Sequence, residues 1–520
     1  MDMKKIFVLA MCLAAAAACT NLDEQLYSKI AKENFFTSEE QFAKYSARAY
    51  STLQHWGTEK SYWSFDFMVT DEACTPINPI GWWDDEGRYR EVQTHDIPNT
   101  NVLLEQAWVF CFNGIAACND VLDTFAEVQR DFEGKNRVVA EIKVLRAYYY
   151  FMAICYWQYV PFATTKKMEG YPQKKDRAFI FNWIEQEITE NIDHLAVQPT
   201  KEYYGRVTRG VADFLLAKLY LNAEFLTGTP RWADAEAACK DIMTANNGSS
   251  WYKIVKNYKS IFAIKNEMNE EGIMAIPYST VYTTSDHYAF LIYISTLPVD
   301  LCEPLGIAAE AWDGIVAQPD FFASYEDGDK RKNWTWLYGQ MQDLSGNNLT
   351  IKIQDPDNAE STITVPYVID PYMPEEAYTT HRTALQGARI QKWDYQSDMT
   401  LTGGQVGMEN DFYIMRYADV VLMYLESLLR QNKTTAEEAA ITDFDKIRDR
   451  AGLSAIAFAD LTLEKLYQER SHELALEGWH RQDMIRFGKY LGAWWNKPVT
   501  GESDYNLPIP KSAKAANPNL

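Results

Sequence analysis

Long runs in which apolar residues recur every three or four positions constrain the fold of this chain more than any other feature. One run extends from Asn101 to Phe125 and a second from Val138 to Tyr156. This spacing matches the period of an α-helix and differs from the alternation of a strand. The two runs predict two amphipathic helices joined by a short polar turn.

The helical pattern returns in later parts of the chain. Apolar positions recur from Ala212 to Leu226 and from Ile414 to Leu428, and a further helix is expected to start near Trp232. Small residues that permit close approach of helices occur at Ala147, Ala217 and Ala233. Because the chain has no fixed repeat period, we predict a mostly α fold built from degenerate tetratricopeptide-like helix pairs.

The middle of the chain has a different composition. From about residue 251 to residue 410 it is rich in Gly, Pro, Asn, Asp, Thr and Tyr, which favours long loops and short strands. Leu349–Gln354 and Ser361–Val365 alternate apolar and polar residues around the turn-forming segment Asp355–Asn358. They predict one β-hairpin within a loop-rich, short-strand insertion.

The length of the chain bears on how these parts are organised. At 520 residues a single hydrophobic core would have stopped growing, so closely packed lobes or a stack of helices are expected. We expect residues 19–520 to form one compact unit with three parts. These are a helical scaffold over 19–250 that carries a loop at 71–101, a loop-rich aromatic insertion over 251–410 and a helical region over 411–520.

The N-terminus has the pattern of a lipoprotein signal peptide. Lys4 and Lys5 precede the apolar stretch Ile6–Ala18, which is too short to span a bilayer and ends in small residues before Cys19. Residues 1–18 are therefore expected to be removed. Cys19 is expected to be acylated and to anchor the protein; the alternative is an ordinary signal peptide with an incidental cysteine.

The net charge excludes one class of partner. The chain has 50 Lys and Arg against 72 Asp and Glu, a formal charge of −22, so its surface repels phosphate backbones. Nucleic acid is not an expected partner. The other cysteines lack CxxC spacing and favour buried free thiols over a disulfide framework or metal site, with one or two disulfides left open. They are Cys74, Cys111, Cys118, Cys155, Cys239 and Cys302.

Several sequence blocks, in order along the chain, carry a specific resemblance. They comprise the start Cys19–Glu24, the blocks Tyr413–Glu426, Ile447–Leu453 and Glu469–Gly488, and the tail segments Leu507–Pro510 and Asn517–Asn519. Together they resemble the SusD/RagB family. Charges in these blocks alternate in sign at helical spacing, which predicts that they pair between packed helices and hold the scaffold.

The resemblance implies a function that composition and periodicity do not. It implies a lipoprotein at the outer membrane, facing the cell exterior, that binds glycans without chemistry and passes them to a SusC-like TonB-dependent transporter. The alternative is a peptide-binding or lid subunit of such a transporter with little glycan affinity. No cofactor is expected.

Residues 82–89 are the best candidates for a ligand site. Sugars stack their C–H faces on aromatic rings and exchange hydrogen bonds with planar polar groups. Trp82 and Trp83 follow a turn-prone segment, and Asp84 and Arg88 accompany them. Glycan-binding family members carry a loop tryptophan here, and Asn101 lies just behind. The alternative is that one or both indoles pack into the core.

The middle of the chain supplies further candidates for the wall of the site. These are Tyr282, Tyr288 and Trp312, the last in a segment that resembles the family only loosely. Packing within the core is the competing interpretation of each.

The sequence offers little support for an enzymatic function. The cluster Asp84–Glu86 is acidic, but its carboxylate separation is not readable from sequence. The seven histidines are dispersed without an HExxH motif, and neither a P-loop nor a GxSxG motif is present. We therefore expect neither a catalytic residue nor a metal site.

Overall fold

Two long helices form the centre of the N-terminal half. The computed structural model describes residues 36–58, 60–77, 85–279, 282–283, 295–307, 311–378, 382–395 and 408–520. Within them, α6 (Val102–Ala126) packs along α7 (Lys135–Tyr156), as the periodicity predicts. The apolar surface of α7 is buried on several sides, so this helix is the core of the helical part.

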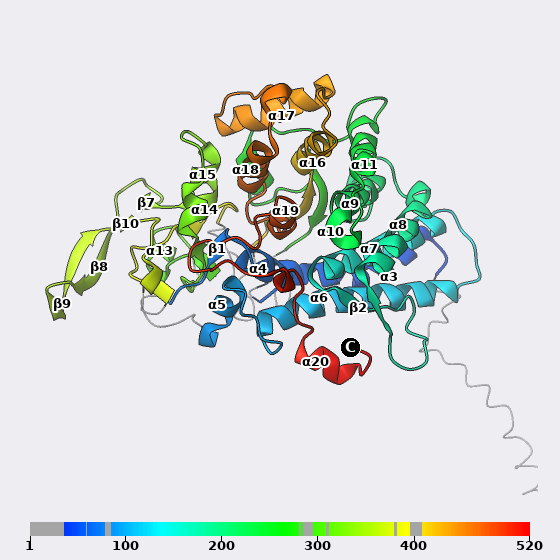
Figure 1. The fold of residues 1–520 in the computed structure, drawn as a ribbon, viewed down its shortest axis with the longest axis horizontal. Helices are drawn as coiled ribbons and strands as arrows, with labels where there is room; N and C mark the ends of the chain where they lie inside the picture. Colours follow the sequence, from blue (N-terminus) through cyan, green and yellow to red (C-terminus); the bar gives the residue numbers. More distant parts are fainter. Residues whose placement is uncertain are drawn as a thin grey trace, which may run out of the picture.

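A row of helices continues from this pair (Figure 1). α8 (Arg177–Thr189) packs on α7, α9 (Arg209–Leu221) on α8, and α11 (Trp232–Thr244) on α9. α16 (Tyr417–Arg430) then packs on α11, although the whole middle of the chain separates them in sequence. The row ends with α17 (Glu438–Ala451) and α18 (Leu463–Glu473), which both pack on α16. The predicted mostly α fold is confirmed.

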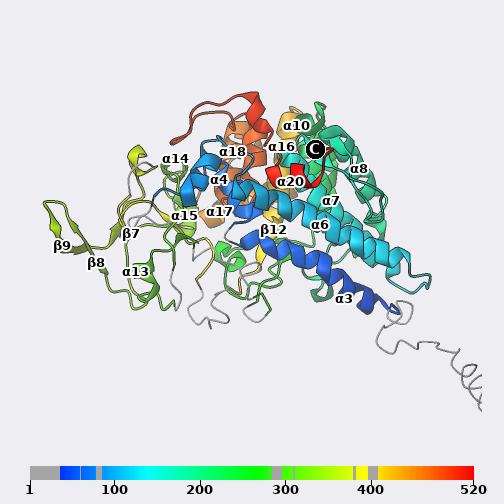
Figure 2. The same cartoon turned by 90° about the horizontal axis from the view of Figure 1, so that it is seen from below.

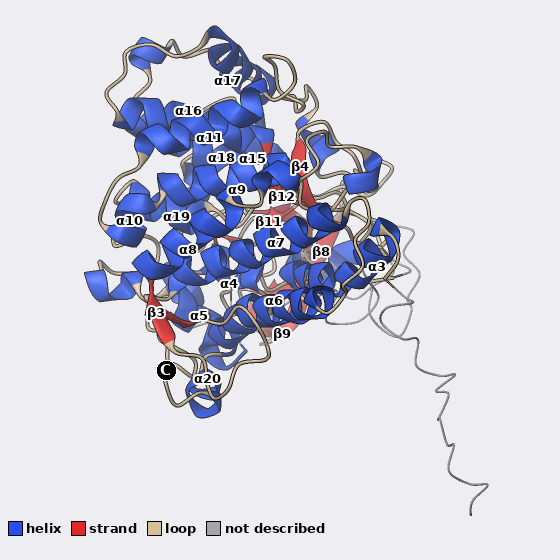
Figure 3. Ribbon diagram, turned by 90° about the vertical axis from the view of Figure 1, so that its right-hand side faces the viewer, coloured by secondary structure: helices blue, strands red, loops and turns tan. Residues whose placement is uncertain are grey.

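The other described α-helices have at most 12 residues and lie beside this row or beyond its ends (Figure 1 and Figure 3). They are α3 (Glu39–Tyr50), α4 (Tyr62–Met68), α5 (Arg88–Gln93), α10 (Ala223–Thr227), α13 (Val299–Cys302), α14 (Pro319–Ala323), α15 (Lys330–Thr335), α19 (His480–Arg486) and α20 (Lys511–Ala516). Among the described helices we find none that combines the length and the apolar character needed to cross a bilayer.

The strands of the described chain are short and pair in twos. β4 (Gly272–Ile276) is antiparallel to β12 (Phe412–Arg416), and this pair ties the middle of the chain to the start of α16. The other short pairs are β1 (Ala73–Cys74) with β5 (Val316–Ala317), β2 (Tyr159–Pro161) with β3 (Lys174–Asp176), β6 (Trp336–Leu337) with β11 (Arg389–Ile390), and β7 (Gly339–Gln340) with β10 (Val368–Ile369).

The predicted hairpin is present. β8 (Thr350–Asp355) pairs with β9 (Asn358–Pro366), and Ile351 and Ile353 stand opposite Val365 and Ile363. The second strand starts three residues earlier than expected, because the turn is tighter than the four-residue segment in the sequence suggests. The hairpin projects from the body of the molecule at the end remote from α3 (Figure 2).

A buried cluster of charges joins the C-terminal helices to the middle of the chain. Arg416 donates from Nε to Glu477 at 2.6 Å and from Nη1 to Glu473 at 3.2 Å, and it also pairs with Glu271. Arg331 and Arg450 contact the same Glu473 carboxylate. The prediction that the family blocks hold the scaffold through paired charges is confirmed.

Candidate functional site

Five of the residues predicted to bind ligand or lipid lie outside the described residues. They are Cys19, Trp82, Trp83, Asp84 and Tyr288. The structure does describe the chain on both sides of the tryptophan pair, up to Ile77 and again from Asp85. The described part of the site consists of the residues that flank this segment.

Strand pairing brings the start of this segment to Trp312. β1 ends at Cys74, three residues before Ile77, and β5 starts at Val316, four residues after Trp312. The strands are antiparallel and Cys74 stands opposite Val316. Because the strands are antiparallel, the C-terminal end of β1 and the N-terminal end of β5 lie at the same end of the pair. The segment that follows β1 and the segment that precedes β5 thus adjoin the same end of this strand pair, although they are far apart in sequence.

A buried arginine joins a third segment to these two. The backbone N–H of Arg382 donates to the carbonyl of Ile77 at 3.0 Å. Its guanidinium donates to the backbone carbonyl of Asp313 and forms an ion pair with the Asp313 carboxylate at 2.7 Å. Arg382 therefore links Ile77, where the segment with Trp83 starts, to Asp313, which follows Trp312.

Asp313 is held by a second buried arginine. Arg389, on β11, donates from Nε to the Asp313 carboxylate at 2.9 Å. Burial lowers the pKa of Arg389 to about 10 while Asp313 opposes the shift, so the guanidinium is cationic at neutral pH. Asp313 has a positive φ of 52°, and its N–H donates to Leu297 at 3.2 Å. These contacts fix the backbone that carries the half-buried Trp312.

Asn101 has a structural role, contrary to the prediction that it binds ligand. It is 2% exposed and caps α6, where its Oδ1 accepts from Leu103 and Leu104 at 2.9 and 3.2 Å. Its Nδ2 donates to the carbonyl of Arg88 and to Glu91, both at 2.8 Å. The amide is therefore fully used inside the protein.

Arg88 and Tyr282 are both accessible to solvent. Arg88 pairs with Glu86 at 2.8 Å and stands at the start of α5. Tyr282 is 87% exposed, beside a turn in which Thr283 donates to Ser279 at 2.9 Å. Both keep their predicted role as candidates.

The arrangement around Trp312 suits binding better than acid–base chemistry. Asp313 is the carboxylate adjacent to the aromatic ring, and ion pairs with two guanidiniums occupy it. A hydrolase would need a carboxyl group free to exchange a proton. Within the ranges that the structure describes, we find no group of three His, Cys, Asp or Glu residues able to hold a metal ion.

Sequence reasoning missed Arg382 and Arg389. Both lie in a loop-rich segment without periodicity, and a lone arginine in such a segment is normally a surface residue. The signal that was present is the segment Trp312–Gly314, where an aromatic residue precedes an acidic residue and a glycine.

Comparison with known proteins places the chain among relatives. A model described as "SusD family" matches residues 246–520, and a model described as "Starch-binding associating with outer membrane" matches residues 21–221. The chain belongs to the SusD family. The starch-binding protein SusD of Bacteroides thetaiotaomicron is 26% identical over 411 residues, covering 73% of this chain and 71% of that protein.

Solved structures of the family share this fold. A laminarin-binding SusD-like protein superimposes with a TM-score of 0.73 at 21% identity, covering 93% of this chain and 98% of that one. Surface glycan-binding protein A of B. thetaiotaomicron, solved with laminarihexaose, gives 0.72 at 19% identity, covering 93% and 99%. At these identities the likeness establishes the fold.

Proposed function

We propose that this SusD-family member is a non-catalytic glycan-binding lipoprotein of the outer membrane. It captures oligosaccharide or polysaccharide at the cell exterior and delivers it to a SusC-like TonB-dependent transporter. The observation that carries the proposal is the place where the adjoining ends of β1 and β5 meet Arg382, called the junction below. The segment that contains Trp82 and Trp83 and the segment that contains Trp312 both start there.

The chemistry of this junction supports a neutral sugar ligand. Indole rings offer flat apolar faces for the C–H surface of a pyranose, and a fixed polar backbone around them accepts and donates hydrogen bonds. The acidic chain, with a formal charge of −22, disfavours strongly anionic ligands. Relatives named for starch, laminarin and laminarihexaose are consistent with this class of ligand.

A glycan array tests the ligand class. Residues 20–520 are applied beside the Trp312→Ala variant, with release of reducing ends measured in the same samples. We expect binding to cluster on one linkage family, to weaken by roughly tenfold without Trp312, and to occur without hydrolysis. A blank array from a folded sample would favour the peptide-binding or lid function, and released sugar would overturn the non-catalytic assignment.

The lipid anchor has its own test. Replacing Cys19 with alanine removes the thiol that would carry the acyl chains, and each buried CH₂ contributes about 0.8 kcal/mol of membrane affinity. We therefore expect Cys19→Ala to move the protein from the outer-membrane fraction to the soluble fraction on cell fractionation. Cys12→Ala, within the same N-terminal segment, is the matched control and should remain with the membrane. Sedimentation of both variants with membranes would contradict the anchor.

A further inference from the structure

A hollow lies in another part of the molecule, beside the start of α9. It has a volume of about 140 Å³ and its walls include Tyr203, Tyr204, Trp251, Asn269 and Tyr413. None of the segments that build the junction at Trp312 lines it. Figure 1 shows α13 and α14 on the left of the molecule and α9 to the right of its centre. The two features are therefore separate sites.

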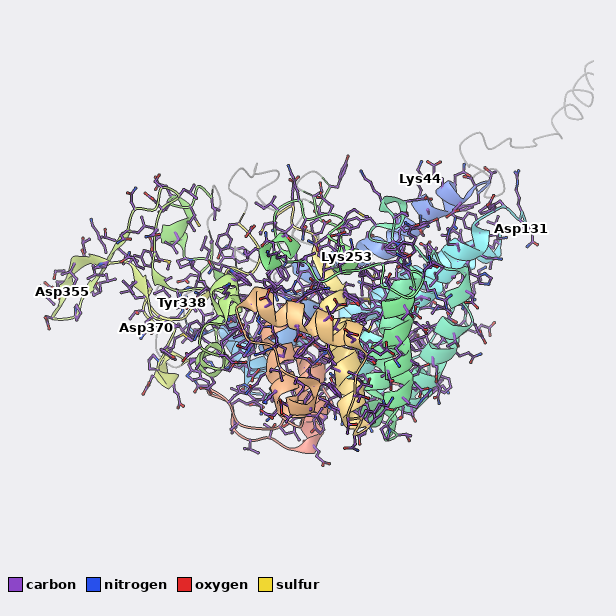
Figure 4. All side chains as sticks on the ribbon, turned by 90° about the horizontal axis from the view of Figure 1, so that it is seen from above. Lys44, Asp131, Lys253, Tyr338, Asp355 and Asp370 are labelled. Carbon is purple, nitrogen blue, oxygen red and sulfur yellow. The ribbon has the colours of Figure 1, made fainter. Side chains whose placement is uncertain are left out.

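A separate, larger hollow lies beside this one. It measures about 380 Å³, and Tyr204 and Gly205 line both. Gly205 has a φ of +70°, and a Cβ there would stand 2.9 Å from the ring of Pro277. A glycine is thus required at this residue, which lines both hollows. The two hollows can be found in Figure 4 by two labelled residues. Lys44, on α3, lies beside the larger hollow, and Lys253 follows Trp251 and Tyr252 at the smaller one.

Internal contacts hold the aromatic walls of the smaller hollow in place. The Tyr204 hydroxyl donates to the Asp411 carboxylate, which also accepts from the N–H of Tyr278 at 2.9 Å. The Tyr413 hydroxyl accepts from the N–H of Asn269 at 3.0 Å. The Tyr413 ring occupies the space where a side chain at residue 272 would start, and Gly272 leaves it free. Rings fixed in this way lose little entropy when a ligand binds.

The smaller hollow combines aromatic surface with hydrogen-bonding groups. Tyr203 lies beneath the guanidiniums of Arg137 and Arg206, at 5.3 and 5.0 Å from the ring centroid. Glu270 is paired with Lys253 at 2.7 Å, so the wall carries little unbalanced charge. The buried indole N–H of Trp251 has no hydrogen-bond partner in the part of the chain that is described. The hollow therefore offers aromatic surface and polar groups with little net charge.

We infer that the smaller hollow is a second carbohydrate site, which takes a single pyranose ring of a long glycan. The inference rests on the proposed function and identifies its substrate as a polymer. Aromatic walls with a few hydroxyl and amide groups suit a neutral ring. A volume of about 140 Å³ is well below the roughly 300–1,000 Å³ of sites for drug-sized molecules, so one ring is admitted at a time.

Two separate sites on one protein make affinity depend on chain length. A polysaccharide that reaches both sites binds the second in an intramolecular step, whereas a hexasaccharide held at the first gains nothing from it. Weakening the second site should therefore affect long glycans selectively.

The test compares binding of long and short glycans by isothermal titration. The probes are laminarin with laminarihexaose and starch with maltohexaose. We compare the variants on whichever of the two polysaccharides the unmodified protein binds. For Tyr203→Ala and Trp251→Ala we expect the affinity for that polysaccharide to fall about tenfold, while the affinity for the matching hexasaccharide stays within about twofold. Thr200→Trp, which fills the rim of the hollow and removes no packing, should have the same effect.

Tyr171→Ala is the matched control, since Tyr171 is 57% exposed and does not line the hollow. It should bind both lengths as the unmodified protein does. If folded Thr200→Trp and Tyr203→Ala bind polysaccharide normally, the second site is overturned while the proposed function stands. If the unmodified protein binds no glycan among these probes or on the array, both the proposed function and the second site are overturned.

Discussion

Replacing Glu473 with glutamine is expected to lower the free energy of unfolding by about 3–5 kcal/mol, the usual cost of breaking a buried ion pair from one side. Burial alone would raise the pKa of Glu473, but Arg450, Arg416 and Arg331 outweigh it and lower that pKa to about 2. The side chain is fully buried, so water cannot solvate the guanidiniums that would lose their carboxylate partner. Glutamine would leave three guanidiniums sharing the remaining carboxylates.

Chemical denaturation followed by tryptophan fluorescence measures this loss. Glu464→Gln is the matched control because Glu464 lies on the same helix, α18, and pairs with Lys489 at 2.8 Å. Its side chain is 59% exposed and its partner 40% exposed, so the control should lose less than about 1 kcal/mol. Equal losses in the two variants would contradict the role given to the buried cluster.

The double variant Trp82→Ala, Trp83→Ala is expected to weaken glycan binding by at least about a hundredfold, since paired aromatic platforms of this kind dominate binding energy. Both indoles belong to the segment that follows Ile77, whose carbonyl accepts from the N–H of Arg382. The free energy of unfolding should change by less than about 1 kcal/mol if these rings face ligand.

Titration calorimetry and denaturation of the same samples separate the two roles. Trp232→Ala serves as the control, because Trp232 packs under Arg430 at 4.8 Å on α11, far along the row of helices from the junction. It should lose stability and retain glycan affinity. A double variant that loses several kcal/mol of stability and keeps its affinity would show that Trp82 and Trp83 are core residues.

Some details of the site were open to prediction from sequence and were interpreted differently. Asn101 stands directly before the apolar run of α6, which is the usual pattern of a helix cap. Its position behind the tryptophan pair favoured a ligand role instead. The local sequence around Asn101 was therefore consistent with a helix cap as well as with a ligand-binding residue, and the structure shows that it is a cap.

The positions of Arg382 and Arg389 were not open to prediction. Each becomes important only through Asp313, which lies more than sixty residues earlier in the chain. Their contacts to Asp313 are long-range, and no periodic pattern in the surrounding loops indicates them. The same holds for the hollow at Tyr203, whose walls come from four separate segments.

The sequence by itself determined the mostly α fold, the helix pair α6 and α7, the hairpin β8 and β9 and the family. These follow from local periodicity, turn residues and motifs, which a linear pattern records. Only the tertiary structure decided that the segment of Trp82 and the segment of Trp312 leave from one edge, and that Asn101 is a cap. Such facts depend on which distant strands and charges pair, and the free energy of those pairings is a property of the folded chain as a whole.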